Sequence, residues 1–67
     1  MTYGDIVKII AQNARIDEEQ ARVVADYYWH CGVLRREHGG IKITDEIYFS
    51  RPMIFIALGD ARQEVCE

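Results

Sequence analysis

Two helix-start signals near the N-terminus constrain the fold of this chain most strongly. Thr2, with Asp5 three positions later, forms an acidic variant of the capping box. Asp17 begins a second signal of the same kind. Each signal precedes a run in which apolar residues recur at helical spacing. The sequence therefore predicts two consecutive helices joined by a short connection, over residues 3–14 and 18–37.

Glycines and a change in hydrophobic period mark the predicted end of the second helix. Gly39 and Gly40 are expected to end it, because glycine is the residue that most often follows a helix. From Ile41 the apolar residues alternate with polar ones, which is typical of a half-buried strand. With a turn at Asp45-Glu46, the pattern predicts a short β-hairpin, or wing, over residues 41–49.

The C-terminal segment has two interpretations. By composition, Met53–Leu58 is typical of a buried strand, yet Ile54, Leu58 and Ala61 recur at helical spacing. The helical pattern continues into a polar stretch that a strand would not need, so we predict a helix over residues 52–65 and keep the strand as the alternative. The predicted fold is α+β and helix-rich, a single small domain over residues 1–67.

The length of the chain limits its core. A chain of 67 residues buries only roughly 60% of its unfolded surface, while 49% of these residues are hydrophobic. We therefore expect some apolar surface to meet a protein partner or a second copy. Tyr28 and Cys31 are expected to be buried on the main stripe of the second helix. Its small residues Ala21, Ala25 and Gly32 form a candidate surface for a second chain.

The reactive side chains do not form a recognisable catalytic or metal site. His30 and Cys31 are adjacent on the predicted helix and point about 100° apart, while Cys31 and His38 are two turns apart, too far for one zinc ion. We predict no enzymatic activity, cofactor, metal or small-molecule substrate. Two cysteines, Cys31 and Cys66, are too few for a secreted disulfide scaffold, which favours the cytoplasm. No apolar run is long enough to span a membrane.

The run Tyr27-Tyr28-Trp29 gives the first candidate binding residues, because three consecutive aromatics cannot all enter one small core. Trp29 is expected on the polar side of the helix, where the stems of Arg22 and Arg36 could simply cover its indole ring. Alternatively, it anchors a protein interface, where Trp, Tyr and Arg are enriched. The candidate partner-binding residues are Trp29, Tyr27, Arg22 and Arg36.

Basic residues between the long helix and the hairpin give a second candidate site. The net charge of the whole chain is -3, which argues against a simple basic nucleic-acid coat but not against a local basic patch. The candidate nucleic-acid contacts are Arg35, Arg36, Lys42 and Arg51. A solvated helix end explains Arg35 and Arg36 on its own, and a phosphate contact is the alternative.

The stretch from Gly32 to Thr44 resembles the end of the recognition helix and the wing of a winged helix-turn-helix. The resemblance covers residues 2–49 and implies that residues 2–11 match the helix before the turn and that the recognition helix begins at Asp17. Two features depart from the family. The helix that usually precedes the pair is missing, and the recognition helix would begin with three acidic residues where DNA phosphates would lie.

The N-terminal half is also similar to the first helical pair of the histone-like DNA-bending proteins, on Asp5-Ile6-Val7 and Ala21-Arg22-Val23-Val24, although their basic arms are absent. Our leading hypothesis is a small non-enzymatic regulator or inhibitor that is winged-helix-like and acts through protein–protein contacts. The alternative is a DNA-binding transcription regulator that uses the basic helix end and the wing.

Overall fold

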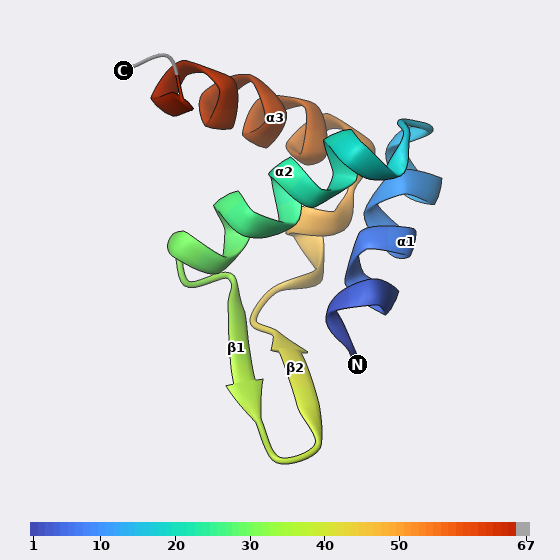
Figure 1. Cartoon of the computed structure of the whole chain (residues 1–67), viewed down its shortest axis with the longest axis vertical. Helices are drawn as coiled ribbons and strands as arrows, with labels where there is room; N and C mark the ends of the chain where they lie inside the picture. Colours follow the sequence, from blue (N-terminus) through green and yellow to red (C-terminus); the bar gives the residue numbers. More distant parts are fainter. Residues whose placement is uncertain (66–67) are drawn as a thin grey trace.

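The chain forms a helical pair, a β-hairpin and a C-terminal helix, joined in that order (Figure 1). The computed structural model describes residues 1–65. The helical pair and the hairpin are α1 (Tyr3–Ala14), α2 (Glu18–His30), β1 (Leu34–Glu37) and β2 (Gly40–Ile43). A 3-10 helix, η1 (Glu46–Phe49), then leads into α3 (Arg51–Val65). The α+β, helix-rich fold predicted from the sequence is confirmed.

Helix α1 begins and ends where its sequence predicts. Both halves of its capping box form: the Thr2 hydroxyl accepts from the Asp5 amide at 3.2 Å, and the Asp5 carboxylate accepts from the Thr2 amide at 3.3 Å. The hydrogen bonds from Thr2 lower the pKa of Asp5. Past Ala14, Arg15 has a left-handed backbone with a φ of 56°, which reverses the chain toward α2.

Helix α2 starts as predicted but is shorter than predicted. The Asp17 carboxylate accepts from the Gln20 amide at 2.9 Å and caps the first turn. The helix ends at His30 rather than at residue 37, because Gly32 adopts a φ of 82° and closes a Schellman motif. In that motif the Val33 amide donates to the Tyr28 carbonyl oxygen at 2.9 Å.

The predicted hairpin forms, but it occupies residues 34–43, so the predicted bounds of 41–49 are wrong. The strands are antiparallel, with Glu37 opposite Gly40, so Gly39 lies in the turn, with a φ of 82°, instead of ending a helix. The segment predicted as the second strand is η1. It forms because the Asp45 carboxylate accepts from the Ile47 amide at 3.1 Å and caps a helical turn.

Helix α3 confirms the helical interpretation of the C-terminal segment, and the strand alternative is wrong. The residues at helical spacing turn toward the other helices: Ile54, Ala57, Leu58 and Ala61 are buried. Phe55 and Ile56 lie on the opposite side and are exposed. The helix thus has apolar residues on both faces, which explains why its sequence also fits a buried strand.

The core lies between the three helices and is closed by η1. The Tyr28 ring stacks on the Phe49 ring, with their centroids 6.1 Å apart. The Tyr28 hydroxyl donates to the Tyr48 carbonyl oxygen at 2.5 Å. Burial, followed by the neighbouring tyrosines, raises the pKa of Tyr28 to about 12.

Two expectations about the stripe on α2 are wrong. Ala21 and Ala25 are buried within the chain's own core, so this small-residue stripe is not a surface for a second chain. Cys31 is a free, exposed thiol because α2 ends at that point and the chain turns away from the core.

Candidate interaction surface

Trp29 lies in the last turn of α2 and is exposed over 37% of its surface. The guanidinium of Arg36 lies over its ring, 6.0 Å from the centroid, within range of a cation–π interaction. The expected contact between these two side chains therefore forms, although Arg36 comes from β1 and not from a later turn of the same helix. The Schellman motif after α2 returns the chain past Trp29 and creates this contact.

The rest of the predicted partner-binding set is only partly assembled around Trp29. Arg22 is exposed two helical turns before Trp29, on the same side of α2. Between them, the Asp26 carboxylate accepts from the Tyr3 hydroxyl at 2.8 Å, which ties α1 to α2. Partial burial, followed by this hydrogen bond, raises the pKa of Tyr3. Tyr27 points elsewhere: it is half-buried, with its ring 6.4 Å from that of Tyr28.

The hairpin carries most of the predicted nucleic-acid contacts. Arg35 and Lys42 lie directly opposite each other in the register, and like charges at such a pair are destabilising. Lys42 is also 3.7 Å from the Glu37 carboxylate, an exposed ion pair that contributes about 0–1 kcal/mol. With Arg36, the two strands hold three positive side chains against one negative one. The hairpin is therefore a local basic patch on an acidic chain.

Arg51 does not belong to this patch. It is the first residue of α3, which lies at the opposite end of the longest axis from the hairpin turn (Figure 1). The molecule extends 34 Å along that axis. The Arg51 guanidinium instead lies 5.7 Å from the centroid of the Phe55 ring. The predicted nucleic-acid set is thus divided between two ends of the molecule.

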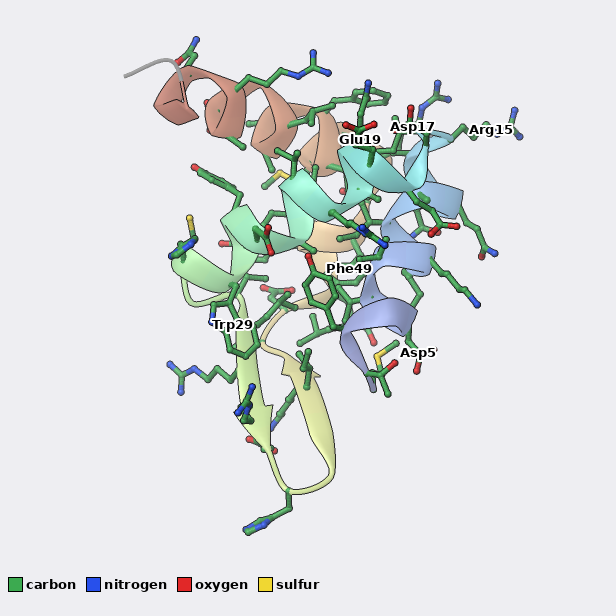
Figure 2. All side chains as sticks on the ribbon, in the orientation of Figure 1. Asp5, Arg15, Asp17, Glu19, Trp29 and Phe49 are labelled. Carbon is green, nitrogen blue, oxygen red and sulfur yellow. The ribbon has the colours of Figure 1, made fainter. Side chains whose placement is uncertain are left out.

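The acidic start of α2 is also far from the hairpin. Figure 2 shows Asp17 and Glu19 at one end of α2 and Trp29 at the other, close to the start of β1. Trp29 follows Asp17 by 12 positions, which correspond to about 18 Å of helix rise. A partner held at the hairpin therefore need not contact these carboxylates.

The chemistry-bearing side chains around the end of α2 remain dispersed. His30, Cys31 and His38 are all exposed. Within residues 1–65, no three His, Cys, Asp or Glu side chains are grouped so that they could hold a metal ion. Cys66 lies outside the described residues.

Sequence reasoning missed a second exposed apolar surface. It consists of Phe55 and Ile56 on the outer side of α3, which are exposed over 43% and 57% of their surface. Ile47 of η1 is a separate exposed apolar residue, over 59%. The unbroken apolar run of residues 53–58 was the available signal, because a helix with apolar residues on every side cannot bury all of them against one core.

The helices of residues 1–65 were also compared with the requirements of a membrane span. In this part of the chain, no helix is both long and apolar enough to cross a membrane.

Comparison with known proteins found no relative of this chain. No protein family, curated protein or solved structure matches it.

Proposed function

We propose that this protein is a small non-enzymatic binding module that regulates or inhibits a larger protein through direct contact. The observation that carries the proposal is the exposed Trp29 indole, held under the Arg36 guanidinium where α2 meets β1. Trp and Arg are the side chains most enriched among residues that dominate binding energy. We place the module in the cytoplasm, where an exposed free thiol such as Cys31 stays reduced.

The charge on α2 favours a protein partner over DNA. In a winged helix-turn-helix, α2 would be the recognition helix and would enter the major groove. Its exposed charged residues outside the last turn are Glu18, Glu19, Arg22 and Asp26. Three negative charges against one positive charge would be repelled by phosphates, whereas a protein surface of mixed charge can match them.

A DNA-binding regulator is the second candidate, and one observation favours it. Arg35 and Lys42 face each other across the hairpin, and a phosphate between them would relieve their repulsion. The order of α1, α2 and hairpin is similar to the helix pair and wing of the winged helix-turn-helix. On this account the wing alone contacts the backbone of DNA, and Arg51 takes no part.

Affinity capture from the native host with quantitative mass spectrometry tests the leading proposal. The bait is wild-type protein, Trp29→Ala or Phe55→Ala. Phe55 is a matched control, because it is also an exposed aromatic ring beside an arginine but lies on α3. We expect a protein that is retained by the wild type and by Phe55→Ala and is lost with Trp29→Ala. Equal retention by all three baits would contradict the proposal.

Salt-dependent binding to duplex DNA tests the second candidate. Three phosphate contacts, from Arg35, Arg36 and Lys42, give a slope of log affinity against log salt of about -2.7, at roughly -0.9 per contact. Substituting both Arg35 and Lys42 by Ala should reduce the slope to about -0.9. A slope that does not change in the double variant would exclude the hairpin as the DNA contact.

A further inference from the structure

One edge of the hairpin is already occupied by the N-terminal residue. The Ile41 amide donates to the Met1 carbonyl oxygen at 2.6 Å, and the Met1 amino group donates to the Ile41 carbonyl oxygen at 3.4 Å. This reciprocal exchange is the pattern of a hydrogen-bonded pair in an antiparallel ladder. Met1 therefore adds a one-residue third strand to the outer edge of β2.

The same contact fixes the direction of the backbone groups on β1. Because both polar groups of Ile41 point toward Met1, Ile41 forms a non-hydrogen-bonded pair with Arg36, the residue opposite it. The amide and carbonyl of Arg36 therefore also point away from the hairpin, on its other edge. The Thr44 amide, which donates to the Val33 carbonyl oxygen at 2.9 Å, agrees with this alternation.

The outer edge of β1 is open at Arg36. Leu34 is buried, which closes the edge nearer the core, whereas Arg36 is exposed. In the part of the chain that the structure describes, no backbone group donates to or accepts from the outward groups of Arg36. An exposed strand edge with an unpaired amide and carbonyl is a template for an added strand.

The side chains around this edge define what can be added. Those of Arg35, Lys42 and Glu37 lie on one face of the hairpin, where two positive charges stand against one negative charge. The side chain of Arg36, beside the Trp29 ring, lies on the other face. An added strand presents its side chains alternately to these two faces. Acidic residues would match the Arg35 face, and apolar residues would contact Trp29.

We propose that the protein partner supplies an extended segment in which acidic and apolar residues alternate, and that this segment pairs with Arg36 as an additional strand on the outer edge of β1. This inference rests on the proposed function and names the kind of partner. The added strand would pair with Arg36 as Met1 pairs with Ile41, so the hairpin would become the centre of a short sheet.

Synthetic peptides test the inference by NMR. The probes are a short peptide of alternating glutamate and valine, the same peptide N-methylated on the residues that face β1, and a lysine–valine counterpart. In the free protein, we expect fast hydrogen exchange at the Arg36 amide and slow exchange at Arg35, whose amide faces β2. The glutamate–valine peptide should slow exchange at Arg36, and the other two should bind at least about fivefold more weakly.

A pair of variants separates the backbone from the side chain. Arg36→Ala removes the guanidinium, its stem and its contact with Trp29 but keeps the backbone amide. Arg36→Pro removes these groups and the outward amide as well, and because that amide does not bond to β2, we expect the β1–β2 ladder to remain. We expect Arg36→Pro to bind the glutamate–valine peptide about fivefold more weakly than Arg36→Ala. The amides of Arg35 and Lys42 report whether the hairpin is still formed. If Arg36→Pro disrupts it, the N-methylated peptide decides the question.

Three results would overturn the inference. They are slow exchange at Arg36 in the free protein, equal binding of the methylated and unmethylated peptides, and equal binding of the acidic and basic peptides. If, in any of these cases, Trp29→Ala still fails to retain the protein that the wild type captures, the proposed function stands and only strand addition is wrong. If capture is also unaffected by Trp29→Ala, both are wrong.

Discussion

The hydroxyl of Tyr28 joins α2 to the segment that leads into α3, and Tyr28→Phe tests how much this bond contributes. The substitution keeps the ring stacked on Phe49. It removes the hydroxyl that donates to the Tyr48 carbonyl oxygen, 2.5 Å away. The bond is part-buried, so leaving its acceptor unpaired costs about 1–2 kcal/mol, the lower part of the range for buried groups. A domain of 67 residues has a total free energy of unfolding of roughly 3–10 kcal/mol, so the loss is a large share of it.

The pH dependence of stability gives an independent check on the same residue. The pKa of Tyr28 is about 12 in the folded chain and about 10 when unfolded, so folding favours the neutral phenol. This contribution is fully present below pH 10 and is lost as the pH rises from about 10 through 12. Tyr28→Phe should therefore lose less stability than the wild type over that interval.

Urea unfolding followed by circular dichroism measures the loss of stability at pH 7 and, from pH 9 to 11.5, its alkaline decline. Tyr3→Phe is the control, because its hydroxyl bonds to Asp26 at the surface, and it should cost less than about 1 kcal/mol at pH 7. A Tyr28→Phe variant as stable as the wild type at pH 7 would refute the role given to this hydrogen bond. A variant with the same alkaline loss as the wild type would refute the burial of the Tyr28 phenol as the cause of its raised pKa.

Three backbone substitutions test the turns. Arg15→Gly should stabilise the protein by about 1 kcal/mol, because a φ of 56° strains a side chain; a lower melting temperature would contradict this. Gly32→Ala should destabilise the protein by about 1–2 kcal/mol, because a side chain is strained at the Gly32 φ of 82°. Unchanged urea unfolding would show that the Schellman motif is not needed. Gly40→Ala should release the N-terminal residue, because its Cβ would lie 2.6 Å from the Met1 carbonyl oxygen. Faster hydrogen exchange at the Ile41 amide would report that release, and unchanged exchange would contradict it.

The helices could be predicted where local chemistry decides them. The Thr2 and Asp17 caps act within one turn, so their residue types and spacing are sufficient. The end of α2 depends on a choice between Gly32 and the later Gly39-Gly40 pair, and periodicity does not make that choice. Tyr27 and Leu34, seven positions apart, keep helical spacing across Gly32, so the apolar pattern continues beyond the point where the helix ends.

The candidate surface could be predicted in part for the same reason. Trp29 was expected at the surface because Tyr28 already faces the core, and it is exposed. Its contact with Arg36 was expected along one helix but forms across a turn. The open edge of β1 depends on strand register and on the pairing of Met1 with Ile41, a contact between residues 40 positions apart that no local pattern encodes.

Trp29→Ala, measured for stability and binding together, tests the central claim most directly. We expect a folded variant whose affinity for the captured protein falls by at least about 30-fold, equivalent to the roughly 2 kcal/mol of an interface hot spot. Phe55→Ala should retain wild-type affinity. Truncating a core tryptophan instead costs about 3–5 kcal/mol, enough to unfold a domain of this size. A Trp29→Ala variant that is unfolded at 25 °C, or one that is folded and binds with unchanged affinity, would contradict the claim that Trp29 is a partner anchor.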